Sequence, residues 1–286
     1  MIGMQWNIIK GIIIIVAFIL LLSAFIFFIN VRPFRNYDPD TPDRYGINYE
    51  EVTFNTSDKI TIHAWLMKPE KSDGTVIIGH GYPFNKGNIL SVAKFLYPDY
   101  TLLFYDHRYF GQSSGSATSV GAKEAKDVEA AVTFIRKKYG KAEPIALYGF
   151  SLSASAALMA KTEVNAIIAD SSYADLESMV KQMYWIFGPL KYPFVKVTSL
   201  LSKIFFGVYP KEVSPAESVK DIKAPILLIH GEKDMQIPVK HAYSIKESNP
   251  DIELWVVAGA RHGQAHATVQ EEYEKRVKDF LKKNMK

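Results

Sequence analysis

The stretch PIALYGFSLS, residues 144–153, decides the fold because it places a serine between an apolar run and a segment of small residues. A tight strand-to-helix turn of this kind exposes the serine hydroxyl as a nucleophile, and neighbouring side chains crowd the turn. Gly149 relieves that crowding just before Ser151. The last glycine of the usual G-x-S-x-G pattern is replaced by Ser153, which is small enough for a helix to lie close to the strand. Because so short a motif is weak by itself, the residues that accompany it decide its meaning.

A nucleophilic serine needs a general base and a carboxylate that orients the base, because a neutral hydroxyl attacks poorly at pH 7. After a strand–turn–helix serine, the acid comes first along the chain and the histidine second. Asp234 follows the apolar run 225–229 and His262 follows the run 252–257, so each lies in a loop directly after an expected strand. Open parallel sheets have their ligand crevice at the carboxyl ends of the strands. The sequence therefore predicts a triad of Ser151, His262 and Asp234.

Acyl transfer builds negative charge on the substrate's carbonyl oxygen, and two backbone N–H groups aimed at that oxygen stabilise it. We expect one donor at Leu152, the residue after the serine, at the positive end of the helix that it begins. The other is expected at Tyr82, after the flexible run 79–81. The loss of one such donor costs about 3 kcal/mol of transition-state stabilisation. The predicted oxyanion hole therefore consists of the amides of Tyr82 and Leu152.

Two further motifs connect these residues with a known family. His80-Gly81-Tyr82 follows the apolar run 75–79, and residues 106–113, DHRYFGQS, match the pattern D-x-R-x-x-G-x-S. From about residue 50 to the C-terminus, the chain resembles the alpha/beta-hydrolase family, in its serine-esterase, lysophospholipase and serine-aminopeptidase-like branch. The resemblance implies an α/β fold with a mostly parallel eight-stranded sheet, helices on both faces and a helical lid insertion. It leaves the reaction open, because this fold carries esterases, thioesterases, peptidases and non-enzymes.

Other polar residues compete for the same roles. His266 falls where the last helix is expected to begin, and the family pattern aligns on the earlier histidine. Asp170 ends an expected strand, where some hydrolases keep their acid, but we interpret it as a cap for the next turn. His230 is interpreted as structural, and Asp106 and Arg108 are interpreted as a pair that braces their own loop.

Apolar runs alternate with helical stretches along most of the chain, and this alternation favours a largely parallel sheet covered on both faces. The expected strands are 51–55 and 61–67, as an opening antiparallel pair, and then 75–79, 101–105, 144–148, 166–169, 225–229 and 252–257. The clearest helices are 122–139 and 270–283.

The segment between Asp170 and Asp221 breaks this alternation, since it contains no convincing strand and many aromatic residues. The resemblance implies that residues 172–220 form a helical lid over the active site. Their apolar side chains could form a wall for an acyl chain, rest on a membrane, or form ordinary core beneath the lid helices. The sequence leaves these three interpretations open. A lid with this many aromatic residues favours a substrate with an apolar acyl group over a highly charged substrate.

Near the N-terminus, residues 11–31 contain no charged residue and consist mostly of Ile, Leu, Phe, Val and Ala. As a helix, these 21 residues would span roughly 31 Å, which is enough to cross the core of a bilayer. A cleavable signal peptide is the alternative, but its apolar core would be only about 7 to 15 residues long and would end in small residues. The sequence FIFFI at 25–29 fits such a cleavage site poorly. We predict an uncleaved single-pass anchor, residues 1–31.

Two opposed signals bear on the orientation of this anchor. Lys10 and the terminal amine precede the apolar run, whereas Arg32, Arg35 and Arg44 come after it, and this count favours a cytoplasmic catalytic domain. A short N-terminal tail before a single span is instead typical of signal anchors that export the domain attached to them. The absence of cysteine decides little between the two sides. We expect the catalytic domain on the extracytoplasmic side.

The composition agrees with one anchor and one domain. Prolines at 33, 39 and 42 mark residues 32–48 as a linker. Residues 49–286 are then the catalytic domain, of a size that alpha/beta folds fill as one unit. The net charge of +4 is spread along the chain, so no nucleic-acid partner is predicted. No histidine–carboxylate spacing resembles a zinc site and no glycine-rich phosphate loop is present, so no metal or cofactor is predicted.

Together these features predict a membrane-anchored serine hydrolase that cleaves esters or thioesters through an acyl-enzyme. Its expected partners are a small-molecule acyl substrate and the lipid bilayer. One alternative is a serine peptidase of the aminopeptidase-like type, although no charged anchor for a peptide terminus is identified. The other is a non-catalytic binding protein on the same fold, which the intact Ser–Asp–His order disfavours.

Overall fold

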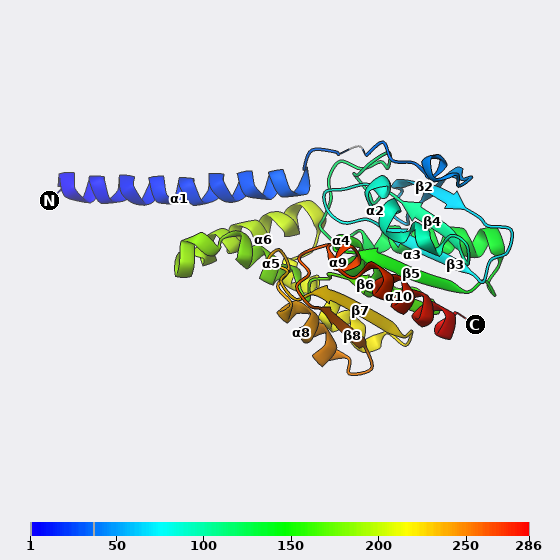
Figure 1. Ribbon diagram of the computed structural model, residues 1–286. Helices are drawn as coiled ribbons and strands as arrows, with labels where there is room; N and C mark the ends of the chain where they lie inside the picture. Colours follow the sequence, from blue (N-terminus) through cyan, green and yellow to red (C-terminus); the bar gives the residue numbers. More distant parts are fainter. Residues whose placement is uncertain (1, 37, 286) are drawn as a thin grey trace.

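The computed structural model describes residues 2–36 and 38–285 (Figure 1). Residues 1, 37 and 286, which fall in the predicted anchor, linker and catalytic domain, lie outside the described residues. The first helix, α1 (Ile2–Val31), projects away from the layered α/β body that the sheet and its covering helices form.

One sheet of eight strands organises the body, in the order β1-β2-β4-β3-β5-β6-β7-β8. β2 is antiparallel to β1 and to β4, and the other neighbouring strands are parallel. The strands are β1 (Glu50–Asn55), β2 (Thr61–Met67), β3 (Thr75–Gly79), β4 (Thr101–Tyr105), β5 (Ile145–Phe150), β6 (Ala166–Asp170), β7 (Ile226–Gly231) and β8 (Glu253–Val257). The predicted mostly parallel sheet with an antiparallel opening pair is confirmed.

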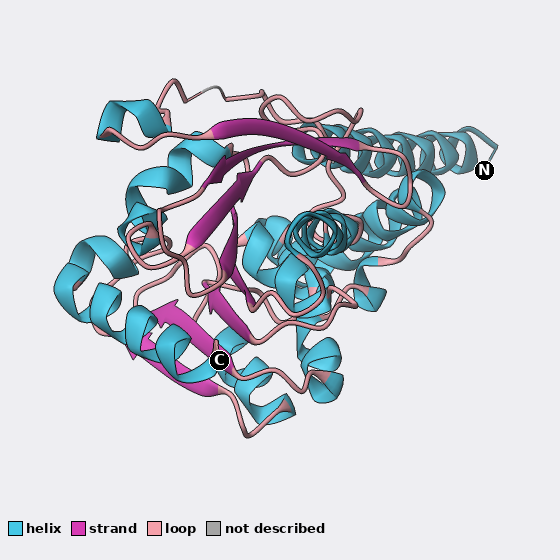
Figure 2. Cartoon of the chain, turned by 90° about the vertical axis from the view of Figure 1, so that its right-hand side faces the viewer, coloured by secondary structure: helices cyan, strands magenta, loops and turns pink. Residues whose placement is uncertain are grey.

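Helices cover both faces of this sheet (Figure 2). Successive side chains of a strand point to opposite faces. Leu147 of β5 therefore belongs to a core that includes residues of α3, α4 and α8, whereas Tyr148 belongs to a core that includes residues of α2 and α10. The helices after α1 are α2 (Lys86–Ala93), α3 (Ala125–Tyr139), α4 (Leu152–Met159), α5 (Leu176–Met183), α6 (Tyr192–Phe206), α7 (Pro215–Ser218), α8 (Lys240–Ser248), α9 (Ala265–Thr268) and α10 (Gln270–Asn284).

Local hydrogen bonds set several of the helix ends. The side chain of Asn85 accepts the Gly87 amide at 2.9 Å and so caps the start of α2. α3 begins three residues later than predicted, at Ala125. The cause is the buried carboxylate of Glu124, which accepts the amides of Ser119 and Gly121 at 2.9 and 2.8 Å and holds the preceding residues in a turn.

The strand order brings the carboxyl ends of β3, β5, β6, β7 and β8 to one edge of the sheet. The chain leaves β6 at this edge and forms α5, the 3-10 helix η3 (Trp185–Lys191), α6 and α7 before it returns as β7. In Figure 1, α6 runs beside α1. Aromatic contacts between the two helices, such as Phe18 with Phe194, agree with this arrangement.

Candidate active site

Ser151 occupies the sharp turn between β5 and α4. Its backbone has φ 52° and ψ −107°, a conformation that is strained for any residue with a side chain. The Ser151 amide donates a hydrogen bond to the carbonyl of Asp170 at the end of the neighbouring strand, at 2.8 Å, and this bond helps to hold the turn. The result is a serine fixed at the carboxyl edge of the sheet, between a central strand and the start of a helix.

Two glycines make this turn sterically feasible. A Cβ on Gly149 would lie 2.5 Å from the Ala154 nitrogen, so only glycine lets α4 approach the strand this closely. A Cβ on Gly79, at the end of the adjacent strand β3, would lie 1.9 Å from the Ser153 Oγ. Gly79 therefore makes room for the serine that replaces the last glycine of the motif. Sequence reasoning missed this compensation, and its only signal was a glycine at the end of an apolar run.

The three residues predicted as a triad meet at the same edge. The His262 Nε2 lies 3.0 Å from the Ser151 Oγ, and the His262 Nδ1 lies 2.7 Å from the Asp234 Oδ2. The other oxygen of Asp234 accepts the amides of Gln236 and Ile237 at 2.9 and 2.8 Å, so the buried carboxylate is fixed in its loop. With its proton on Nδ1, facing the carboxylate, the imidazole can accept the serine proton at Nε2.

Phe150 positions the imidazole from the side, and sequence reasoning did not identify it. Its ring lies 5.4 Å from the His262 ring, centroid to centroid. A Cβ on Gly81 would lie 2.7 Å from the Phe150 Cδ1, and a Cβ on Gly263 would lie 2.7 Å from the Phe150 Cζ. These two glycines leave the space that the ring fills, so the loops of Gly81 and Gly263 pack around one aromatic side chain.

The amides of Tyr82 and Leu152 are free to bind a substrate oxygen. Neither donates a hydrogen bond to any part of the chain that the structure describes. Gly81 precedes Tyr82 and approaches the serine so closely that an added Cβ would lie 3.3 Å from the Ser151 Cβ. Leu152 is the first residue of α4, where amides point out of the helix. The oxyanion hole remains a prediction that these positions suit.

The competing polar residues have other partners. His266 Nε2 lies 3.1 Å from the Glu274 Oε1, and His230 Nε2 lies 2.7 Å from the Ile237 carbonyl oxygen. Asp170 accepts hydrogen bonds from the hydroxyls of Tyr273 and Ser171, each at 2.8 Å, and burial raises the pKa of its carboxyl group. Among the described residues, none of these three side chains bonds with the side chain of Ser151 or His262.

Asp106 and Arg108 brace their loop, but not as the pair that the sequence suggested. The Asp106 Oδ2 lies 2.6 Å from the Nζ of the buried Lys86. Arg108 instead bonds through Nε with Asp127 at 2.9 Å and through Nη1 with Asp58 at 2.8 Å. Both cations come from segments distant in sequence from their partners, which is why adjacency along the chain gave the wrong pairing.

A cavity of about 470 Å³ opens beside His262. Its wall combines the loop after β3, the start of α2 and the loops of the candidate triad. The lining residues are His80, Gly81, Tyr82, Pro83, Phe84, Asn88, Ile89, Val92, Phe150, Asp170, Gln236, His262, Gly263 and His266. Among the residues that the structure describes, none of 172–220 belongs to this lining. The inserted helices thus stand beside the cavity rather than in its wall, and a lid role for them remains a prediction.

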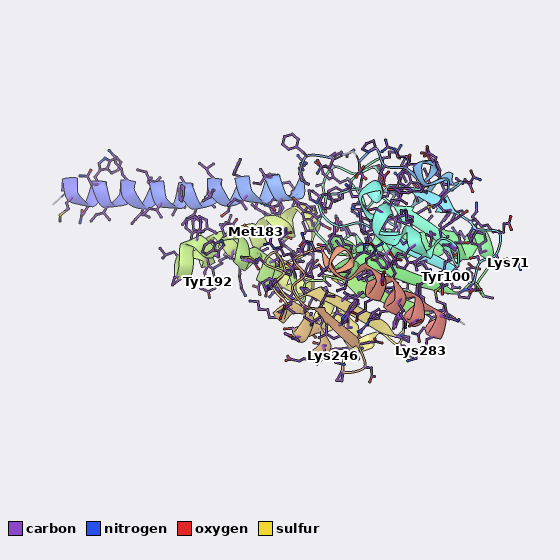
Figure 3. All side chains as sticks on the ribbon, viewed as in Figure 1. Lys71, Tyr100, Met183, Tyr192, Lys246 and Lys283 are labelled. Carbon is purple, nitrogen blue, oxygen red and sulfur yellow. The ribbon has the colours of Figure 1, made fainter. Side chains whose placement is uncertain are left out.

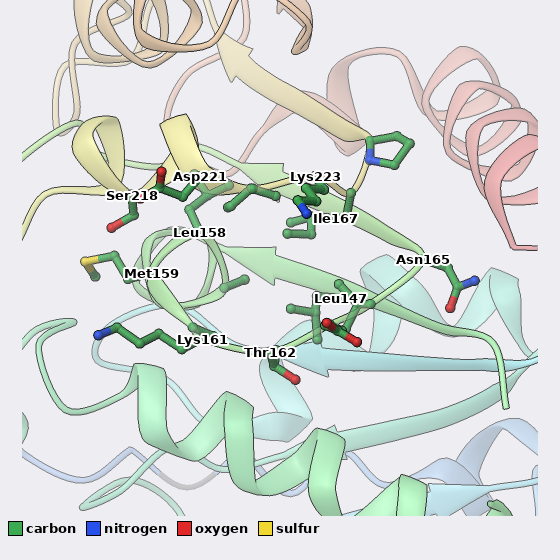
Figure 4. Close-up of a pocket in the computed structure, with 17 residues that line it drawn as sticks. Leu147, Leu158, Met159, Lys161, Thr162, Asn165, Ile167, Ser218, Asp221 and Lys223 are labelled. Carbon is green, nitrogen blue, oxygen red and sulfur yellow. The ribbon is translucent and has the colours of Figure 1, made fainter. Parts of the chain in front are cut away.

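A second hollow of about 620 Å³ lies away from the candidate triad (Figure 4). Asn165 and Pro225, which directly precede β6 and β7, line it together with the end of α4. It therefore lies at the amino ends of parallel strands, opposite the edge where open sheets bind their ligands. Within residues 4–36 and 38–285, no cluster of three or more His, Asp or Glu side chains is placed to hold a metal ion.

The fold and the site together define an alpha/beta hydrolase. Residues 114–286 match the model of the prolyl oligopeptidase family. The chain belongs to the prolyl oligopeptidase family, and the resemblance drawn from its motifs is confirmed.

Similar proteins of known sequence or structure agree with this assignment. An esterase of Pyrococcus furiosus, Pf2001, is 30% identical, with a TM-score of 0.74 over 90% of this chain and 98% of its own. The uncharacterized protein YqkD of Bacillus subtilis is 28% identical over 77% of this chain and 75% of its own length. The uncharacterized membrane protein YNL320W of Saccharomyces cerevisiae is 24% identical over 85% of this chain and 82% of its own. The protein is thus an alpha/beta hydrolase of the prolyl oligopeptidase and esterase type.

Proposed function

We propose that this protein is a membrane-anchored serine hydrolase that cleaves carboxylic ester or thioester bonds of apolar acyl substrates. The observation that carries the proposal is the continuous chain of hydrogen bonds from Asp234 through His262 to Ser151, at 2.7 and 3.0 Å. Such a chain activates a hydroxyl because the imidazole takes its proton while the carboxylate stabilises the imidazolium. The similarity to the Pyrococcus furiosus esterase supports the reaction class.

The reaction would proceed in two halves. The Ser151 Oγ attacks the carbonyl carbon of the substrate as its proton passes to the His262 Nε2, and the resulting oxyanion accepts the amides of Tyr82 and Leu152. Collapse of this intermediate expels the alcohol or thiol, which takes the proton from His262, and leaves an acyl-serine. A water molecule, deprotonated by His262, then attacks the acyl-serine and regenerates the hydroxyl. Asp234 stays ionised throughout and orients the imidazole.

The cavity wall and the anchor favour an apolar acyl group. Phe84, Ile89, Val92 and Phe150 supply apolar surface to the cavity that opens beside His262. Residues Met4–Val31 of α1 are long and apolar enough to cross a membrane, with a mean hydropathy of 3.4 over their most apolar 18 residues. The name of the yeast relative, a membrane protein, agrees with an anchoring role. Substrates with acyl chains dissolved in a bilayer would therefore lie within reach of the site.

Labelling by a fluorescent fluorophosphonate tests the nucleophile in the detergent-solubilised full chain. We expect the wild type to be labelled and Ser151→Ala to lose labelling and ester hydrolysis. Ser155→Ala is the matched control, because Ser155 is another buried serine on α4, bonded with Ser172 at 2.9 Å. Equal labelling of Ser151→Ala and the wild type would refute the proposal, and a panel of esters of increasing chain length would measure the acyl preference.

A peptidase is the second candidate, because the matching family is described as that of prolyl oligopeptidase. The two functions separate by substrate, since a peptidase would hydrolyse aminoacyl amides faster than the corresponding esters. Faster amide cleavage by the wild type, lost in Ser151→Ala, would replace the esterase proposal with this one.

We further propose that the catalytic domain lies on the extracytoplasmic side of the membrane. A reporter enzyme fused after Lys286, active on one side only, tests this orientation. Activity of a cytoplasmic reporter would overturn it without affecting the proposed chemistry.

A further inference from the structure

The helical turn η3 and the helix α6 form an arm that runs along the second half of α1. In Figure 1 the arm lies beneath α1, and Figure 3 labels Tyr192 near its far end. Ring centroids of Phe18 and Phe194 are 6.3 Å apart near this end, and those of Phe28 and Phe205 are 5.2 Å apart near the other. The arm therefore follows α1 from Phe18 to Phe28.

The inner face of the arm is packed and its polar groups are paired. Tyr184, Phe194 and Val195 are buried against apolar side chains of α1. The hydroxyls of Tyr184 and Thr198 lie 2.7 Å apart, and the buried Ser23 of α1 donates to the Phe194 carbonyl at 3.5 Å. This face holds the arm on α1, so the two helices form one apolar unit.

The outer face of the arm exposes large apolar side chains. Trp185, Ile186 and Leu190 at the tip are 71, 67 and 74% exposed, and Ile204 continues the exposed surface along α6. Leu200 and Phe205 are also partly exposed, but they lie on the side of α6 that faces α1. Soluble proteins leave few contiguous apolar surfaces of this kind open to water, because exposed apolar area costs about 25 cal/mol per Å². The surface is continuous with that of α1, whose side chains are also exposed. The same apolar surroundings can cover both.

The length of the arm matches the depth of one lipid leaflet. The rise of α1 from Phe18 to Phe28 is about 15 Å, which is half of a bilayer core of roughly 30 Å. Residues 185–206 contain three lysines and no acidic residue. Lys203 lies near the end of the arm that contacts Phe28, and its side chain can extend toward the headgroups, where anionic phosphates attract it. An arm of this length suits the depth of one leaflet.

A groove between the arm and α1 offers a place for an acyl chain. Its volume is about 510 Å³, and apolar side chains make up most of its wall. Val16, Ile19 and Leu20 come from α1, and Pro193, Val197 and Leu200 come from α6. Lys196, Ser199 and Tyr209 complete the lining, and a lipid chain in this groove would lie against the apolar side chains of its wall.

We infer that η3 and α6 form a second membrane-embedded element, which lies within one leaflet beside α1 and is covered by bilayer lipid. This inference rests on the proposed anchoring of the chain by α1. The side-chain amide of Gln182 in α5 donates to the carbonyls of Met235 and Gln236, at 3.3 and 3.1 Å. α5, which leads into the arm, is thereby bonded to the loop of Asp234, so an embedded arm would hold the cavity close to the surface of that leaflet.

Single-cysteine labelling tests the inference cleanly, because the natural chain contains no cysteine. The variants Ile186→Cys, Leu190→Cys and Ile204→Cys would carry a bimane fluorophore in the full chain, reconstituted in vesicles of equal parts phosphatidylcholine and phosphatidylglycerol. Leu21→Cys, on the exposed surface of α1, is the lipid control, and Lys275→Cys, on α10, is the water control. Quenching by brominated lipids reports lipid contact, and quenching by iodide reports contact with water.

We expect brominated lipids to quench the three arm positions at least half as strongly as Leu21→Cys, and iodide to quench them far less than Lys275→Cys. Iodide quenching like that of the water control would place the arm in water and overturn the inference. Protection from both quenchers would mean that protein, such as a second copy of the chain, covers the arm, and this too would overturn it. If Leu21→Cys is not quenched by lipid, the anchor itself fails, whereas fluorophosphonate labelling tests the chemistry separately.

Discussion

The loop of Asp234 is bonded to Gln182 of α5, the helix that leads into η3, yet this loop and the tip of η3 present opposite kinds of surface. In the loop, the buried carboxylate of Asp234 accepts two backbone amides and faces the imidazole of His262 at 2.7 Å, and the Nε2 of His230 lies 3.5 Å from it. At the tip, the apolar side chains of Trp185 and Ile186 are mostly exposed. Hydrogen bonds within the chain therefore satisfy the polar groups of the Asp234 loop, whereas only the surroundings of the protein can cover the apolar side chains at the tip of η3.

The largest effect should come from a substitution in the loop of Asp234, and it should be an effect on activity. Asp234→Asn would leave His262 without the carboxylate that fixes its tautomer, and we expect kcat for ester hydrolysis to fall by about 10⁴-fold. Steady-state hydrolysis of a water-soluble nitrophenyl ester measures this, with the exposed Asp251→Asn as control. A loss of less than tenfold would show that the carboxylate does not orient the base.

The next largest effect should come from the buried ion pair of Lys86 and Asp106, and it should be an effect on stability. Lys86→Met leaves the buried carboxylate of Asp106 without its cation, and breaking a buried pair in this way costs about 3–5 kcal/mol. Urea unfolding of the detergent-solubilised chain measures the change in the free energy of unfolding. The double variant Lys86→Met/Asp106→Asn should recover much of the loss. If the single and the double variant lost the same free energy of unfolding, the unpaired Asp106 carboxylate would not be the cause of the loss.

A smaller, pH-dependent effect should come from His80, beside the cavity. Burial lowers the pKa of its imidazole to about 3, whereas an unfolded histidine has a pKa of about 6.5. Between these values the unfolded chain binds more protons, so the stabilisation is complete above pH 6.5 and is lost as the pH falls toward 3. His80→Gln should reduce the slope of unfolding free energy against pH by up to about 1.4 kcal/mol per pH unit in this window. Identical slopes for variant and wild type would contradict the assignment.

The smallest effect should come from the tip, where packing within the chain is least. Ile186→Ser should change the free energy of unfolding in detergent by no more than about 0.5 kcal/mol, because the side chain is exposed. Ile229→Ser, in the buried centre of β7, is the matched control and should be strongly destabilised. A loss at Ile186 as large as that at Ile229 would mean that the tip belongs to a protein core, and the comparison would fail.

Most of the fold could be predicted from the sequence because it depends on short-range patterns. The apolar runs predicted all eight strands to within two residues at each end, and α10 begins at the predicted Gln270. The candidate triad was also local in this sense, since each of its residues comes directly after its own strand. The helix α3 was predicted to begin too early, because a buried carboxylate, which composition does not reveal, holds the residues before it in a turn.

The sequence could not supply the partners that folding brings together from distant segments. Gly79 and Ser153 are complementary only because β3 and β5 are neighbours in the sheet. The wrong pairing of Asp106 with Arg108 has the same origin, since Lys86 and Asp127 reach them only in the folded chain. Phe150 likewise becomes a packing partner of His262 only when two loops close on it.

By itself, the sequence determined the order of strands and helices, the apolar helix at the N-terminus and the order of serine, acid and histidine, because each depends on residues that are close along the chain. Only the tertiary structure decided which charges pair behind the site, which glycine admits Ser153, and that α6 lies on α1 instead of lining the cavity. These outcomes depend on contacts across the whole molecule, and a contact between distant segments leaves no periodic signal in either of them.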